Sequence, residues 1–176
     1  IVSFNKLDDP TLRIGQLIVI PGGRGIALKP DPTRAPTKLG SSAPSRTYRF
    51  AGGRLKWPVP GGYISQRFHY PHMAIDIAAP MGTPVYASAA GTVVFAGWYT
   101  NGGGYQVWIS HGSGMYTTYN HMMSVAVRAG QQVAKGTRVG RVGMTGNATG
   151  PHCHWEVWVG YPWRYTSHRV NPMNYL

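Results

Sequence analysis

The sequence predicts a mainly β protein built from antiparallel sheets and short glycine-rich turns. Glycine and proline are abundant, with 24 and 14 of the 176 residues, which favours short strands and turns over long helices. From Trp57 onward, short alternating segments are interrupted by glycine, and none is long with the 3.6-residue period of an amphipathic helix. A hydrophobic content of 43% fits a folded domain with one sizeable core.

The first 56 residues differ in composition from the rest of the chain. The sequence of residues 1–21 predicts a helix that starts at Asp8-Asp9-Pro10, the only helix expected in the chain. It also predicts a short apolar strand from Gln16 to Ile20. The run from Leu7 to Pro21 resembles the second half of a LysM module, a small glycan-binding unit. Residues 22–56 are rich in Gly, Pro, Ser, Thr and basic side chains, which predicts a linker or, alternatively, a segment lying across a groove of the next domain.

Residues 57–176 are expected to form the principal domain. Segments that predict strands lie at residues 84–89, 91–97, 105–111, 115–121, 125–127, 130–133 and 138–143. The third and fourth of these segments predict a hairpin around Gly112-Ser113-Gly114. Gly82-x-x-Val85 resembles Gly130-x-x-Val133 in spacing, which indicates a duplicated β-unit and a sandwich of the hybrid-motif type.

The charge balance favours anionic partners. The chain has 17 Lys and Arg against 5 Asp and Glu, a formal net charge of +12, which suits nucleic acid, anionic lipid or an acidic cell-wall polymer. No helix-turn-helix, RNP or zinc-finger pattern is present, so nucleic acid is not an expected partner. The single cysteine excludes an internal disulfide and a cysteine-based zinc cluster. No apolar run approaches the length of a membrane span, and a start at Ile1 without a signal peptide indicates a processed product.

Two histidines stand close together in the segment from Gly150 to Val159. If this segment is extended, His152, His154 and Glu156 share one face, while Cys153 and Trp155 point the other way. Two imidazoles held side by side suit a metal site or a proton-transfer site. The plain alternative is a pair of polar residues on a solvated strand face.

A second pair is His72 and Asp76, whose four-residue spacing places both side chains on one side of a strand or of a helical turn. From Trp57 to the C-terminus, only Asp76 and Glu156 carry carboxylates. Because Asp76 lies among apolar residues, it needs a cationic partner, either a metal ion or an arginine. His72, Asp76 and one of the two later histidines would give three ligands and an open position, as in catalytic zinc sites. The other histidine would then transfer protons.

Several stretches together resemble the lysostaphin-type (LytM-like) zinc metallopeptidases, which cut peptidoglycan peptides. The matching stretches are residues 72–87, 91–98, 119–122, 130–136, 143–157 and 170–176. The resemblance implies that His72, Asp76 and His154 bind one zinc ion. It also implies that His121 and His152 are catalytic, assisting deprotonation of water and stabilising a tetrahedral oxyanion.

The family's activity implies an endopeptidase that acts on peptidoglycan cross-links or stem peptides outside the cytoplasm, whether secreted, periplasmic or cell-wall associated. The basic surface would help it adhere to anionic cell-wall polymers. One rival is an inactive relative that binds the envelope and activates another hydrolase, although all five site positions are present. Another is a biotinyl- or lipoyl-type carrier, but Lys135 lacks the flanking methionine pattern.

Some positions depart from the family pattern or remain open. Asn120 stands where alanine is common, and Cys153 stands where an apolar residue is usual and is expected to be buried rather than a ligand. Glu156 is expected either to orient a histidine from behind or to pair with an arginine. His111 and His168 match no motif position and are expected to be structural or surface residues. Trp98-Tyr99 and Gly102 to Gly104 are the expected groove wall.

Overall fold

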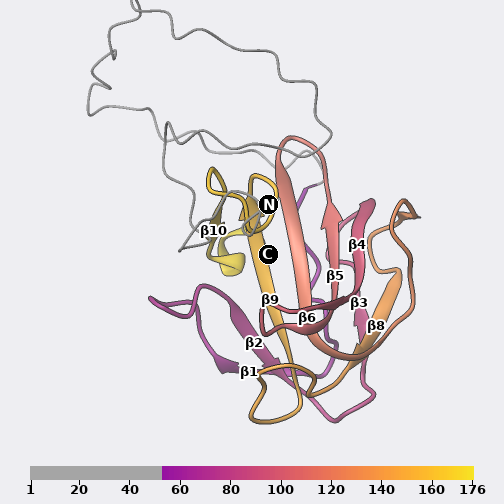
Figure 1. The fold of residues 1–176 in the computed structure, drawn as a ribbon, viewed down its shortest axis with the longest axis vertical. Coiled ribbons are helices and arrows are strands. Elements are labelled where there is room, and N and C mark those ends of the chain that lie inside the picture. Colours follow the sequence, from indigo (N-terminus) through magenta and orange to yellow (C-terminus); the bar gives the residue numbers. More distant parts are fainter. Residues whose placement is uncertain (1–52) are drawn as a thin grey trace, which may run out of the picture. The chain divides into compact units, whose positions relative to one another are not determined.

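The computed structural model describes residues 53–176, which form ten strands and one turn of 3-10 helix (Figure 1). The strands are β1 Tyr63–Gln66, β2 Ile75–Ala78, β3 Pro84–Tyr86, β4 Gly91–Tyr99, β5 Gly104–Ser110, β6 Met115–Val125, β7 Gln132–Val133, β8 Arg138–Val142, β9 His152–Val159 and β10 His168–Val170. The mainly β fold expected from the sequence is confirmed. The LysM-like segment, with its helix and strand, and the linker as far as residue 52 lie outside the described residues.

Every pair of neighbouring strands is antiparallel within the described residues. The main sheet has the order β1-β2-β9-β6-β5-β4-β7, and β10 adds to β9. Strands β5 and β6 form the hairpin that was expected around Gly112-Ser113-Gly114. In Figure 1 the long strands β9, β6 and β5 run side by side through the middle of the domain. Among residues 53–176, no helix has the length and apolar character that a membrane span requires.

The repeated glycine-valine spacing has a structural counterpart. Strand β3 pairs with β8, and β4 pairs with β7, so the first strand of each unit joins the second strand of the other. Gly82 and Gly130 precede β3 and β7 with φ of 89° and 83°, a left-handed conformation that glycine adopts without steric strain. The two units therefore enter their strands through the same kind of turn.

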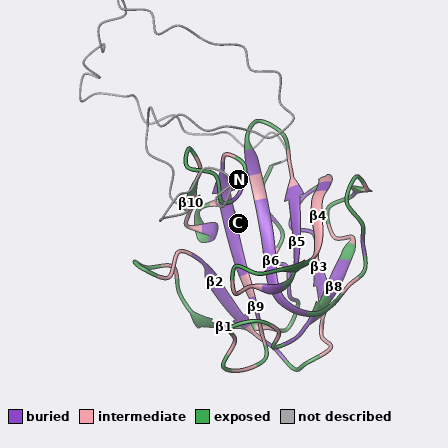
Figure 2. Ribbon diagram, viewed as in Figure 1, coloured by how far each residue is buried: buried purple, intermediate pink, exposed green. Residues whose placement is uncertain are grey.

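The core is built largely from β2, β9, β6 and β5, and Figure 2 shows these strands as mostly buried. Strand β9 is buried along most of its length because both of its faces are covered. Its only half-buried members are His152 and His154. Cys153 and Trp155 point into the core, as the alternation predicts. A rigid, well-packed strand therefore carries both histidines.

The ends of the described chain meet at the core. Leu55 is buried, and its N–H donates to the carbonyl oxygen of Tyr175 at 2.6 Å. The N–H of Lys56 donates to the carbonyl oxygen of Ser88 at 2.8 Å. The sequence predicted a helix only in the N-terminal piece, but the structure also has a turn of 3-10 helix, η1 Pro172–Tyr175. This turn starts at Asn171, whose side chain accepts a hydrogen bond from Met173 N–H.

We expect Tyr119→Phe to lower the free energy of unfolding by about 1–3 kcal/mol. The Tyr119 side chain is fully buried, and its hydroxyl oxygen accepts hydrogen bonds from Ser88 N–H at 2.7 Å and from the Thr117 hydroxyl at 2.9 Å. The substitution leaves both donors without this acceptor in the core. Urea unfolding followed by circular dichroism measures the effect. Tyr63→Phe, at an exposed position, is the control and should change stability by less than about 0.5 kcal/mol.

Candidate metal centre

The five residues expected at the site come together where β2, β9 and β6 run side by side. Asp76 of β2 pairs in register with His154 of β9, and His154 pairs on its other side with Asn120 of β6. His121 follows Asn120 with a φ of 61°. His72 lies in the loop before β2. His72 and Asp76 therefore do not share a strand or a helical turn, the two arrangements that their four-residue spacing predicted.

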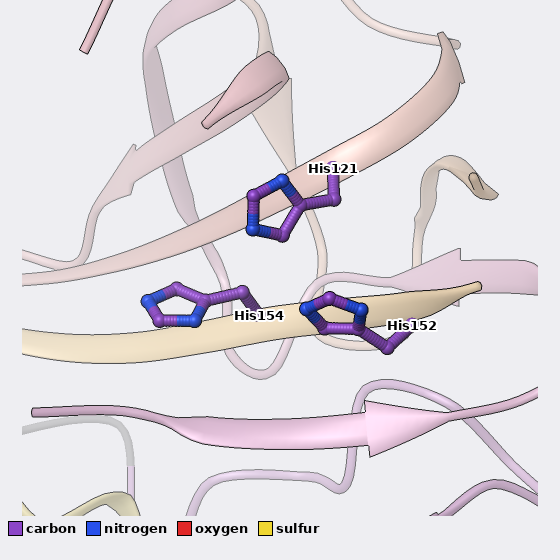
Figure 3. Close-up of side chains that lie close together, drawn as sticks. All are labelled: His121, His152 and His154. Carbon is purple, nitrogen blue, oxygen red and sulfur yellow. The ribbon is translucent and has the colours of Figure 1, made fainter. Parts of the chain in front are cut away.

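The imidazole rings and the Asp76 carboxylate surround one small volume. Asp76 Oδ1 lies 2.7 Å from His154 Nδ1 and 3.8 Å from His152 Nε2, and Asp76 Oδ2 lies 3.1 Å from His72 Nε2. The His121 ring lies 4.8 Å from the His152 ring and 5.7 Å from the His154 ring, measured between centroids. Figure 3 shows the rings of His121, His152 and His154 gathered between β6 and β9.

Main-chain carbonyl groups fix the protonation pattern of three histidines. In each, Nδ1 lies within hydrogen-bonding distance of a carbonyl oxygen: His72 with Arg67 at 3.1 Å, His121 with Thr145 at 2.8 Å and His152 with Gly150 at 2.8 Å. A carbonyl oxygen only accepts, so Nδ1 carries the proton and Nε2 keeps a lone pair. Nε2 of His72 is buried and makes no hydrogen bond within residues 53–176. These are the properties of nitrogens that bind a metal or accept a proton.

His154 differs because both of its ring nitrogens face carboxylates. Nδ1 bonds Asp76 at 2.7 Å, and Nε2 lies 3.4 Å from Glu156 Oε1. Burial opposes protonation of His154, but the hydrogen bonds to Asp76 and Glu156 outweigh it and raise its pKa to about 9. Burial raises the pKa of Asp76, but the hydrogen bond from His154 and the charges of His154, His152 and His72 together outweigh this and lower it overall. Metal binding at Nδ1 must displace the proton held there.

Within residues 53–176, two groups of three side chains have ligand atoms within 4.8 Å of one another. One is His72, Asp76 and His154, and the other is His121, His152 and His154. The first group supplies two imidazoles and a carboxylate, a donor set that suits catalytic zinc. It also contains the buried, unbonded Nε2 of His72. Three imidazoles, as in the second group, also bind catalytic zinc, so the buried Nε2 of His72 is the observation that favours the first group.

Glu156 is fully buried behind His154 and has several polar partners. Its Oε2 accepts hydrogen bonds from the Thr118 hydroxyl at 2.6 Å and from Trp158 Nε1 at 2.7 Å. Its Oε1 faces His154 Nε2 and accepts a hydrogen bond from Arg169 at 3.2 Å. Burial raises the pKa of Glu156, but the bonds from His154 and its other partners outweigh this and lower it. The two roles considered for Glu156, histidine partner and arginine partner, occur together.

We expect Glu156→Gln to weaken zinc binding by about 10–100-fold, because the carboxylate fixes the His154 ring and increases its basicity. Competition with a chromophoric chelator measures the affinity. Thr118→Val removes one hydrogen bond to Glu156 without touching His154, and it should shift the affinity in the same direction by a smaller factor. Unchanged affinity in Glu156→Gln would show that the carboxylate does not support the metal ligand.

A pocket of about 190 Å³ lies over the part of the centre that His121 and His154 form. It is lined by Asn101, Gly102, Gly103, Asn120, His121, Asn147, His154, Glu156, Trp163 and Arg169. Gly102 and Gly103 of the expected groove wall line it, whereas Gly104, Trp98 and Tyr99 do not. The sequence reasoning missed Trp163 and Arg169. They lie after β9, and the return of β10 alongside β9, which no motif marks, brings them to the site.

The remaining singled-out residues lie away from the centre. Cys153 is fully buried in the core, as expected, and burial raises the pKa of its thiol. His111 bonds the Ala90 carbonyl and the Thr117 hydroxyl, each at 2.8 Å, as a structural residue would. His168 is exposed on β10. Asn120 Nδ2 donates to the His154 carbonyl oxygen at 3.0 Å, which ties β6 to β9 beside the site.

The protein-family model described as peptidase family M23 matches residues 70–172 of this chain, which include all five expected site residues. The peptidoglycan DD-endopeptidase ShyA of Vibrio cholerae is 40% identical over 108 residues, which are 58% of this chain and 25% of that protein. The uncharacterized lipoprotein YgeR of Escherichia coli is 29% identical over 186 residues, covering 100% of this chain and 71% of that protein.

Solved structures agree with the family match. A zinc-containing peptidase from Vibrio cholerae has a TM-score of 0.62 and 29% identity, with 69% of this chain and 40% of that chain covered. The antimicrobial peptidase lysostaphin from Staphylococcus simulans has a TM-score of 0.58 and 33% identity, with 65% and 48% covered. The resemblance to lysostaphin is thus confirmed, and the family match covers more than half of the chain. This protein belongs to peptidase family M23.

Proposed function

We propose that the protein is a zinc-dependent endopeptidase that hydrolyses peptide cross-links or stem peptides of peptidoglycan outside the cytoplasm. One observation carries the proposal: the side chains of His72, Asp76, His121, His152 and His154 converge on one small volume beside an open pocket, and they include the buried, unbonded Nε2 of His72. The names of relatives add support, since ShyA is called a peptidoglycan DD-endopeptidase and a structural neighbour is a zinc-containing peptidase.

His72, Asp76 and His154 would hold the metal. They offer Nε2, a carboxylate oxygen and Nδ1, and their other polar atoms are engaged by Arg67, by neighbouring histidines and by Glu156. When bound, zinc supplies a Lewis acid that lowers the pKa of a coordinated water and polarises a carbonyl group. This donor set leaves a position open for substrate.

His121 and His152 would move protons. Each keeps Nδ1 protonated against a main-chain carbonyl and directs Nε2 toward the shared volume. Burial lowers the pKa of His121 to about 4, so its imidazole is neutral at pH 7 and able to accept a proton. After accepting a proton, either ring donates it to the oxyanion of the substrate or to the leaving amine.

The charge distribution suits an anionic envelope. Within residues 53–176, Asp76 and Glu156 are the only acidic side chains, and both are buried. The exposed charged side chains of this region are therefore all positive. Such a surface favours adhesion to anionic cell-wall polymers through long-range attraction that salt weakens.

Digestion of purified peptidoglycan tests the proposal. The protein should release new peptide termini, lose this activity after treatment with a chelator, and regain it on addition of zinc. An inactive regulator would release nothing by itself and would only increase the activity of a second hydrolase. Full activity in protein shown by metal analysis to be zinc-free would contradict the proposal.

A further inference from the structure

Arg169 forms one side of the pocket over the metal centre. It lies on β10, and its guanidinium stands 5.1 Å from the centre of the Trp158 ring and 5.5 Å from that of Trp163. It is the only Lys or Arg among the residues that line this pocket. Two aromatic faces attract the cation and limit its side-chain freedom. Arg169 is therefore a positioned charge rather than a freely moving surface cation.

Most of the hydrogen-bonding capacity of Arg169 remains available. A guanidinium carries five N–H donors in a planar fork. Glu156 Oε1 accepts a hydrogen bond from Nη1 at 3.2 Å, and 29% of the side chain is exposed. The fork geometry matches a carboxylate, which can accept two parallel hydrogen bonds from it. The pocket therefore offers a ligand the chemistry of a carboxylate-binding site.

This cation is close to the reacting centre. Glu156 Oε1 links the two, since it lies 3.2 Å from Arg169 and 3.4 Å from His154 Nε2. An extended chain advances by about 3.3–3.6 Å per residue. Because Nε2 is on the ring edge away from Nδ1, a substrate group bound to Arg169 would belong to a residue within about three positions of the bond held at the metal centre.

Glu156 is the one acidic side chain of the described residues that pairs with Arg169, and it does so through Oε1. Its Oε2 accepts hydrogen bonds from Thr118 and Trp158, and Asp76 lies against His72 and His154. The rest of the pocket lining is neutral apart from the histidines: glycines, asparagines and Trp163. An incoming carboxylate would meet a guanidinium that shares one N–H with Glu156 and has further donors for a two-bond contact.

We propose that Arg169 determines substrate specificity by binding a free carboxylate within about three residues of the scissile bond. A carboxylate on the carbon that carries the leaving nitrogen meets this requirement. A cross-link between D-amino acids in which the amine side keeps its own carboxylate is such a substrate, whereas an uncharged glycine bridge is not. The inference rests on the proposed endopeptidase function and selects one substrate class within it.

Two peptides that differ in one group test this inference. Both carry the same scissile bond, and the residue on the amine side ends in a carboxylate in one peptide and in a carboxamide in the other. The zinc-loaded protein should cleave the carboxylate form with a kcat/KM about 10–100-fold higher, as expected for a charge-assisted bidentate contact. In Arg169→Gln the ratio between the two peptides should fall to about one.

Matched variants separate recognition from structural support. Arg169→Lys keeps the charge without the fork and should retain an intermediate preference. Arg164→Gln is the control, because Arg164 stacks on Tyr161 at 5.5 Å and does not line this pocket, and it should keep the full preference. Zinc content is measured for each variant. If Arg169 only supported Glu156, its loss would slow cleavage of both peptides equally.

Each possible negative result contradicts a different claim. Equal cleavage of both peptides by the zinc-loaded protein, or an unchanged ratio in Arg169→Gln, overturns the role of Arg169 and leaves the endopeptidase function standing. Digestion of whole peptidoglycan without cleavage of the carboxylate peptide also overturns it. Absence of hydrolysis of either peptide and of peptidoglycan contradicts the proposed function itself.

Discussion

Replacing His154 with alanine should abolish zinc binding and lower peptidoglycan hydrolysis by at least about a thousandfold. His154 is the one residue that belongs to both groups with metal-ligand spacing, and its ring bridges Asp76 and Glu156. Without it, two donors remain on one side of the centre, too few for a catalytic zinc site. Elemental analysis of the purified variant, together with chromatography of released peptides, measures both effects.

The matched control is His168→Ala. His168 is a histidine on the adjacent strand β10, but it is exposed and does not line the pocket over the centre. This variant should keep one zinc ion per chain and full activity. Zinc retained at full stoichiometry by His154→Ala would rule out His154 as a ligand, whatever the activity of that variant.

Replacing His152 with alanine should separate metal binding from catalysis. We expect this variant to keep zinc and to lose about 10²–10⁴-fold in kcat, the usual contribution of a general acid or base. His152 Nε2 lies 3.8 Å from Asp76, farther than His72 Nε2 and His154 Nδ1, which places it beside the ligand group rather than within it. Single-turnover kinetics with parallel zinc analysis is the measurement.

His121→Ala provides the comparison for this second prediction. Its ring lies next to that of His152, and its Nδ1 is held in the same way. The two variants should resemble each other in keeping zinc and losing turnover, and the double variant should lose less than the product of the single effects if the two rings act as a unit. Loss of zinc from His152→Ala alone would instead make it a ligand.

The alternation of β9 is the feature that sequence reasoning handled best. Strand geometry has a period of two, so the side-chain directions of His152, His154 and Glu156 follow once the segment is extended. The scarcity of acids was equally informative, because a buried carboxylate needs partners. Both acidic residues of the described domain have those partners around the same centre.

Other features depend on contacts that no local pattern encodes. Residue spacing alone did not decide between His152 and His154 as the ligand; in the structure only His154 has both ring nitrogens beside carboxylates. The position of His72 depends on the path of a loop, which strand and helix periods do not describe. Arg169 reaches Glu156 because β10 returns along β9, a tertiary pairing of segments that carries no motif.

A crystal structure of the zinc-loaded protein, with the metal located by its anomalous scattering, tests the metal assignment most directly. We expect one zinc ion bound by His72 Nε2, Asp76 and His154 Nδ1 at about 2.0–2.2 Å, with His121 and His152 unbound beside it. A zinc ion held instead by His121, His152 and His154, the other group with suitable spacing, would contradict the assignment of ligands and of proton-transferring residues together.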